Sequence, residues 1–138
     1  MSARGIALGD LLALFGFSLL GLASHEHEVT AVALARTFVP FAVSWLAVGG
    51  LAGTLSPAAD GHPAIGLRFL AVYLVAGVIA LSARSLIFDR VLFNAFLVIA
   101  LVGNGLFLYG WRAAAAWWPG RRSAPIRRHG LDDSGLRD

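Results

Sequence analysis

A short run of metal-binding residue types stands out first in the sequence. Residues 24–28 read Ser-His-Glu-His-Glu, which puts two imidazoles and two carboxylates side by side. Zinc uses such ligands, but a structural zinc site needs four of them. Residues two apart do not share a helix face, so His25 and His27 would share an ion only in an extended loop, with two further ligands from elsewhere. We interpret the segment as a solvated loop and predict no metal site.

Sequence motifs for enzymatic chemistry are missing as well. The chain has no HExxH zinc motif, no nucleophile elbow and no phosphate-binding loop. It also has no cysteine, which excludes disulfides, thiolate catalysis and cysteine-ligated metals. We therefore predict no catalytic residue, no cofactor and no enzymatic activity.

The polar residues that remain lie in or beside long apolar segments. Hydrophobic residues make up 58% of the chain and charged residues 14%, against averages of about 45–50% and about 25% for soluble domains. An arginine at mid-bilayer costs about 2.5–3.5 kcal/mol on insertion scales, so such residues are either paired or functional. The candidate site residues are Asp10, Arg36, Arg68, Asp89, Asn94 and Asn104. Both a structural role and a ligand contact remain open for them.

The apolar segments predict an all-α membrane protein, a bundle of four transmembrane helices. We place the helices at about residues 6–23, 30–54, 64–83 and 91–111, each long enough to cross a bilayer. Together they form one domain, residues 1–113, followed by a basic, disordered tail, residues 114–138. Gly21 and Ala23 also fit the cleavage site of a signal peptide, but Asp10 favours a retained first helix.

The arginines predict the orientation of the bundle. Four spans put both termini on one side, together with seven arginines: Arg4, Arg68, Arg112, Arg121, Arg122, Arg127 and Arg128. The other side has three, Arg36, Arg84 and Arg90. The positive-inside rule then places both termini in the cytoplasm and the protein in the cell membrane. Since the positive charge is concentrated in a tail beside a helix, we expect contact with the lipid bilayer and not with nucleic acid.

This topology predicts which charges meet. Asp10 and Arg68 would both lie a turn or two inside the cytoplasmic face, and an ion pair would relieve both desolvation costs. We predict an Asp10–Arg68 contact. For Arg36 we favour an interfacial anchor whose side chain snorkels to the headgroups. The alternative is an arginine that binds an anion or is held by an acidic partner, Asp89 at a similar depth or Glu28 closer to the surface, and we predict a contact with one of these two carboxylates.

Proline and glycine predict helix shape and packing. Pro40 removes a backbone donor inside the second helix and should kink it. Gly49 and Gly53 form a small-xxx-small pair, and Gly103 and Gly105 flank Asn104; both arrangements allow a neighbouring helix to come close. Tyr109, Trp111, Trp117 and Trp118 predict an aromatic belt at the membrane surface.

Several short motifs together resemble a known family. They are Gly-Asp followed by Leu-Leu-Ala-Leu-Phe-Gly-Phe, the Ser-His-Glu loop, Arg-Thr-Phe-Val-Pro-Phe-Ala-Val-Ser-Trp-Leu-Ala-Val-Gly-Gly, an arginine before the third helix, and Phe-Leu-Tyr-Gly-Trp-Arg-Ala. From about Gly9 to Ala113 the chain resembles the prokaryotic membrane family called domain of unknown function 3054. The resemblance implies an integral membrane protein and supplies no catalytic residues. It draws attention to Asp10, Arg36, Pro40 and Trp111–Arg112.

These observations favour one class of function over two others. We expect an accessory or structural membrane component, either a homo-oligomer or part of a larger membrane complex. The alternative is a small-solute or ion transporter that acts as a homo-oligomer, with the candidate polar residues along its path. Eleven arginines without a single lysine, among many alanines and glycines, indicate a GC-rich genome and hence a prokaryote.

Overall fold

Four long helices make up most of the part of the chain that the structure describes, residues 1–24, 30–88 and 95–118 of a computed structural model. They are α1 (Ala3–Ala23), α2 (Ala31–Leu51), α3 (Leu67–Phe88) and α4 (Ala95–Trp117). All four are long and apolar enough to cross a membrane. The predicted fold class, a four-helix all-α membrane protein, is therefore confirmed.

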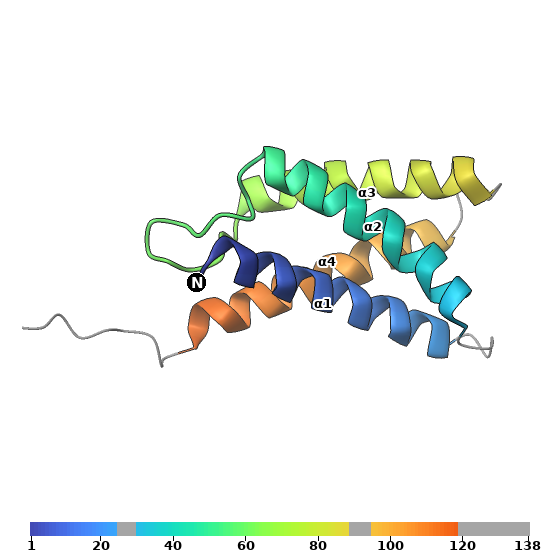
Figure 1. Ribbon diagram of the computed structural model, residues 1–138, viewed down its shortest axis with the longest axis horizontal. Coiled ribbons are helices and arrows are strands. Elements are labelled where there is room, and N and C mark those ends of the chain that lie inside the picture. The colour runs from blue at the N-terminus through green and yellow to red at the C-terminus, as the bar shows by residue number, and fades with distance from the viewer. Residues whose placement is uncertain (25–29, 89–94, 119–138) are drawn as a thin grey trace, which may run out of the picture.

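The helices form two layers. Figure 1 shows α2 and α3 in one layer and α1 and α4 in the other, with α1 also against α2. The contact between α3 and α4 is the slightest of the four neighbouring pairs, and the described helices make no close backbone approach across either diagonal. The start of α1, the α2–α3 connection and the end of α4 lie at the same end of the bundle (Figure 1). We call this end of the bundle the loop end.

Capping residues fix the helix starts. The Ser2 hydroxyl accepts a hydrogen bond from the Gly5 amide at 3.1 Å, and the Thr30 hydroxyl accepts one from the Ala33 amide at 3.1 Å. Each bond satisfies one of the free N–H groups that a helix leaves at its first turn. The sequence thus begins α1 and α2 at their serine and threonine caps.

A glycine ends α2 three residues earlier than predicted. The Gly53 amide donates to the Gly50 carbonyl and the Thr54 amide to the Gly49 carbonyl, the two bonds of a Schellman motif. Gly53 has a φ of 71°, the left-handed conformation that this motif requires. The prediction that Gly53 pairs with Gly49 on one helix face is wrong, because Gly53 lies in the turn.

The other helix bounds differ from the prediction by a few residues. Helix α1 begins at Ala3 rather than residue 6. Helix α3 begins at Leu67 rather than residue 64, since Gly66 takes a φ of 142° that a helix cannot contain, and it continues to Phe88 rather than residue 83. Helix α4 runs to Trp117, so the first residues of the predicted disordered tail are helical.

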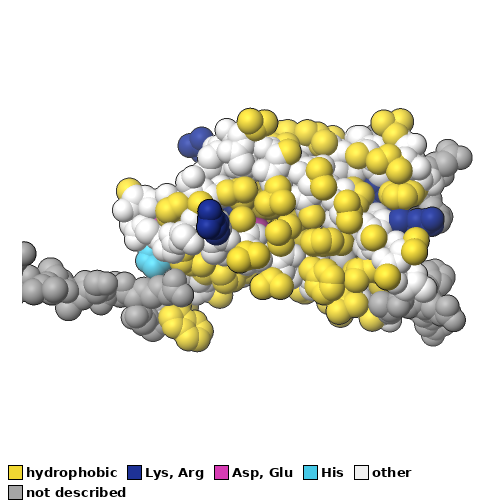
Figure 2. Space-filling view, viewed as in Figure 1, with side chains coloured by type: hydrophobic (Ala, Val, Ile, Leu, Met, Phe, Trp, Pro, Cys, Tyr) yellow, Lys and Arg dark blue, Asp and Glu magenta, His cyan; other side chains and the backbone are white. Residues whose placement is uncertain are grey.

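Helix α3 buries mostly small and aromatic side chains and exposes several large aliphatic ones. On α3, Leu70, Leu74 and Val78 are exposed, whereas Ala76 and Ala80 are buried. Figure 2 shows hydrophobic side chains over most of the middle of one face, with arginine atoms toward the ends. This is the pattern of helices that pack through small residues and present apolar side chains to lipid.

Candidate functional site

The most polar place inside the bundle is the carboxylate of Asp10, on α1. Its side chain has 0% exposure. Oδ1 accepts from Arg112 Nε at 2.9 Å and from Trp111 Nε1 at 3.1 Å. Oδ2 accepts from Arg112 Nη2 at 2.6 Å and from Trp45 Nε1 at 3.0 Å. Four donors therefore satisfy one buried anion, and we refer to Asp10, Trp45, Trp111 and Arg112 as the Asp10 cluster.

Arg112, on α4, completes the cluster from the cationic side. It pairs with Asp10 through two parallel hydrogen bonds, the geometry in which arginine binds carboxylate most strongly. Its remaining nitrogen, Nη1, donates to the Thr54 carbonyl at 3.0 Å and the Ala64 carbonyl at 2.9 Å. The guanidinium carbon also lies 4.7 Å from the centre of the Phe69 ring. The buried charge of Arg112 is thus stabilised by a carboxylate, two carbonyl oxygens and an aromatic ring.

The cluster joins distant parts of the chain. Asp10 comes from α1, Trp45 from α2 and the other two from α4, while Thr54 and Ala64 belong to the α2–α3 connection. That connection is itself a compact turn, with Pro57 and Pro63 bridged in antiparallel fashion and the Ala58 amide donating to the His62 carbonyl at 2.8 Å. One guanidinium therefore fastens the connection to the helices beneath it.

Close packing holds the tryptophans in place. A Cβ at Gly9 would lie 1.8 Å from the Trp111 ring, so only glycine admits that ring beside α1. The Trp45 ring meets the Phe69 ring edge to face, with centroids 5.6 Å apart. Both indole N–H groups consequently point at Asp10 without freedom to turn away.

The arrangement is suited to structure rather than to chemistry on a substrate. A general base needs a lone pair that a substrate can reach, but both Asp10 oxygens are occupied and sealed. Within residues 1–24, 30–88 and 95–118, no three His, Asp or Glu side chains gather in a way that would hold a metal ion. The cluster can bind helices to one another through a neutral ion pair.

The predicted Asp10–Arg68 contact is wrong, since Arg112 is the partner of Asp10. Arg68 is exposed, and its Nη2 donates to the Ala52 carbonyl at 2.7 Å. Ala52 is the C-cap of α2, where the helix dipole is negative. Arg68 lies in the first turn of α3, where the helix dipole disfavours a cation. The neighbouring C-terminus of α2 compensates for this unfavourable interaction.

Arg36 lies toward the opposite end of the bundle from Arg68. Its guanidinium carbon is 5.4 Å from the centre of the Phe88 ring on α3. It borders a groove of about 450 Å³ between α2 and α3. The predicted partners Asp89 and Glu28, and the candidate Asn94, lie outside the described residues.

Asn104 is enclosed in the bundle, with 1% exposure. Its Nδ2 donates to the Ala100 carbonyl at 3.0 Å, and its Oδ1 has no hydrogen-bond partner among the residues that the structure describes. The flanking glycines are packing positions: a Cβ at Gly103 would lie 2.1 Å from the Phe17 ring, and one at Gly105 would lie 2.9 Å from the Tyr73 ring. Tyr73 also donates its hydroxyl to the Leu101 carbonyl.

Two further predicted positions belong to α2. Pro40 lies inside the helix and lines the groove beside Arg36. Gly49 is buried, and a Cβ there would lie 3.1 Å from the Thr54 hydroxyl, which donates to the Gly49 carbonyl. Gly49 thus supports the turn that ends α2 rather than an interface between helices.

Sequence reasoning did not single out Trp45, and although the family resemblance drew attention to Trp111–Arg112, it did not identify Arg112 as the partner of Asp10 and assigned Trp111 to an aromatic belt. Arg112 stands near the end of an apolar run, where arginine ordinarily anchors a helix at the surface. The available signal was the set of short motifs, since Gly9–Asp10, Ser44–Trp45 and Trp111–Arg112 all fall within them. Those three dipeptides contain every side chain of the Asp10 cluster.

Comparison with known proteins gives one positive finding. No curated protein and no solved structure matches the chain. A family model does match, over residues 7–115, which includes all of α2 and α3, most of α1 and α4, and the whole Asp10 cluster. By this match the chain belongs to the family described as "Protein of unknown function (DUF3054)".

Proposed function

We propose that this protein is a non-enzymatic structural or accessory component of a prokaryotic cell membrane, with both termini in the cytoplasm. The observation that carries the proposal is the sealed Asp10–Arg112 pair. The buried charges of Asp10 and Arg112 hold helices together and are not accessible to a solute. The described helices expose many large hydrophobic side chains, which Figure 2 shows on one face and which suit contact with lipid and other membrane proteins.

The positions of the other candidate residues support the same proposal. A transport path needs polar groups that line one water-accessible route. Asp10 and Asn104 have 0% and 1% exposure, and Arg36 and Arg68 stand toward opposite ends of the bundle. These four residues do not share one open cavity.

A homo-oligomeric transporter of a small solute or ion is the second candidate. One observation favours it: the Asn104 Oδ1 is buried and has no partner among the described residues. A buried amide oxygen without a donor is uncommon and would suit a transient cation or hydrogen-bond donor. The geometry around it is closed, so we rank this function below the first.

Native mass spectrometry of the full chain in mild detergent, with co-purified species retained, tests the proposal. An accessory component is expected to carry other membrane proteins in fixed stoichiometry and to give no solute flux in proteoliposomes. A discrete homo-oligomer without partners, showing a flux that Asn104→Leu abolishes and Asn104→Gln retains, would overturn the proposal in favour of transport.

A further inference from the structure

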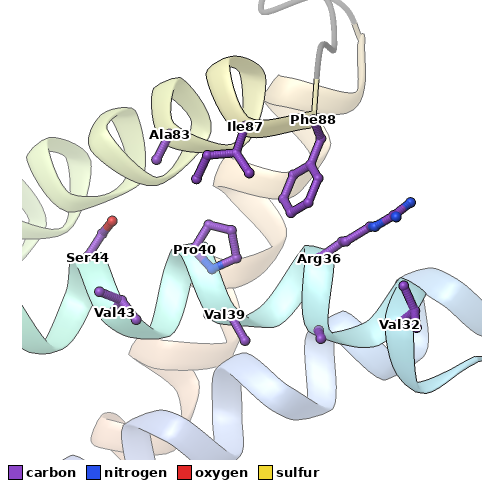
Figure 3. A pocket seen from close by; sticks show the side chains of 10 residues that line it. Val32, Arg36, Val39, Pro40, Val43, Ser44, Ala83, Ile87 and Phe88 are labelled. Carbon is purple, nitrogen blue, oxygen red and sulfur yellow. The ribbon is translucent and has the colours of Figure 1, made fainter.

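A groove between α2 and α3 lies apart from the Asp10 cluster. Figure 1 shows the two helices diverging away from the loop end. The groove lies between them, and Figure 3 shows Pro40 of α2 directed toward Ala83, Ile87 and Phe88 of α3. Its walls are almost wholly apolar and its volume is about 450 Å³, within the range of small-molecule sites.

A single charge marks one end of this groove. Arg36 is exposed and lies beside the Phe88 ring, with no carboxylate partner among the residues that the structure describes. The groove continues from there along α2 to Ser44. The site therefore combines a cationic end with an apolar channel.

The dimensions match one leaflet of a bilayer. The lining runs from Val32 to Ser44, twelve helical steps apart, or roughly 18 Å at about 1.5 Å per step. Half of a hydrocarbon core about 30 Å thick is roughly 15 Å. An occupant with a negative head and an apolar tail of leaflet length satisfies both parts of the site.

We propose that the groove between α2 and α3 binds an anionic phospholipid, with the Arg36 guanidinium on the headgroup phosphate and an acyl chain along Pro40, Val43 and Ala83. Arginine binds phosphate through charge-assisted hydrogen bonds, and its stem reaches the interface from one or two turns inside the helix. A partner helix would have to supply its own anion opposite Arg36, whereas the surrounding membrane supplies the lipid phosphate directly. The inference does not depend on the proposed accessory function.

Lipid retention tests the assignment. The full-length protein is reconstituted in vesicles with equal amounts of phosphatidylglycerol and phosphatidylcholine, extracted in mild detergent and examined by native mass spectrometry. Wild type is expected to retain phosphatidylglycerol preferentially. Arg36→Gln is expected to reduce that retention about tenfold, the effect of losing one charged hydrogen bond. Arg68→Gln, the same change at an exposed arginine near the loop end, is the matched control and is expected to retain the lipid as wild type does.

A second variant separates the tail from the headgroup. Ala83→Phe fills the groove without changing charge, and it is expected to reduce retention of both lipids. This variant also tests the proposal if Arg36→Gln does not fold. Undiminished phosphatidylglycerol retention in Ala83→Phe would overturn the proposal, as would equal retention by Arg36→Gln and Arg68→Gln. Because the chain has no cysteine, Ala83→Cys offers one thiol, and efficient disulfide formation between two copies in the membrane would assign the groove to a second copy instead.

Discussion

Asp10 can be both buried and charged because four N–H groups donate hydrogen bonds to its carboxylate. Moving a lone carboxylate into hydrocarbon is prohibitive, but Arg112 cancels its charge and two indoles occupy its remaining lone pairs. The same geometry makes the pair fragile to a change in one partner, since the other charge stays buried. Removing one member of a buried pair costs about 3–5 kcal/mol in proteins generally.

Asp10→Asn should therefore destabilise the protein by about 3–5 kcal/mol. Asparagine keeps the size of the side chain but leaves the Arg112 charge without its counterion, and its amide donors face the indole donors. Thermal unfolding in detergent, followed by circular dichroism, measures the loss. Arg68→Gln, at the partner first expected from the sequence, should unfold close to wild type because Arg68 is exposed.

A double-mutant cycle isolates the pair itself. Combining Asp10→Asn with Arg112→Gln removes both charges, so the double variant should lose much less than the sum of the single losses. Additive losses would show that the two side chains do not interact in the membrane.

The Trp111 indole adds a hydrogen bond to a charged acceptor, which is worth about 1.5–3 kcal/mol. Trp111→Phe keeps an aromatic ring beside Gly9 but deprives Asp10 of one donor. We expect a lower unfolding temperature for Trp111→Phe than for Trp118→Phe, whose side chain is 72% exposed. Equal unfolding temperatures would mean that the indole N–H contributes nothing to the cluster.

At the scale of the helices, small side chains mark part of the inner face of α3. This helix buries Ala76, Gly77 and Ala80 while several leucines and valines are exposed, because lipid receives large apolar groups as readily as the core does. Gly77 and Gly103 each receive a large side chain from a neighbouring helix, Leu101 and Phe17 respectively. The helices therefore meet through glycine notches filled by rings and leucine.

This explains which parts of the fold could be predicted. The number and type of the elements follow from long apolar runs, which leave no alternative to membrane helices. The pairing of helices does not follow, since helices that are apolar on every side carry no stripe that marks the inner face. The partner of Asp10 could not be predicted for the same reason: depth alone allows Arg68 and Arg112 equally, and only the packing of α1 against α4 selects Arg112.

The glycine notches give a matched prediction within single helices. Gly9→Ala in α1 and Gly103→Ala in α4 place a methyl group 1.8 Å and 2.1 Å from a partly buried ring, and we expect a loss of about 1–3 kcal/mol for each. Gly21→Ala and Gly110→Ala lie on the same two helices, with nothing within 4 Å of the added Cβ. They should be neutral or slightly stabilising, because alanine favours a helix over glycine.

Thermal unfolding of the four variants shows whether the effect of each substitution is set by the close packing around the glycine or by the higher helix propensity of alanine. Similar unfolding temperatures for Gly9→Ala and Gly21→Ala would mean that the Trp111 ring can move aside without loss. That result would also weaken the role assigned to Gly9 in orienting the indole toward Asp10.

The whole molecule has two unlike ends. At the loop end, the Asp10 cluster, the Schellman turn of α2 and the bridged Pro57–Pro63 connection interlock through hydrogen bonds. Toward the other end, α2 and α3 separate and leave an apolar groove with Arg36 at its mouth. Hydrogen bonds therefore hold the helices together at the loop end, whereas an apolar groove stays open toward the other end.

The orientation of these ends in the membrane can be tested with single cysteines, because the chain contains none. Ala58→Cys places a thiol in the exposed α2–α3 connection, and Ser24→Cys places one at the exposed end of α1, on the opposite face. The excess of arginine on the side of the termini predicts a cytoplasmic loop end. In intact cells, a membrane-impermeant maleimide should label Ser24→Cys and leave Ala58→Cys unlabelled until the membrane is permeabilised. The reverse pattern would put the loop end outside, and the Arg36 groove would then face the cytoplasmic leaflet, where anionic lipids attract basic residues most strongly.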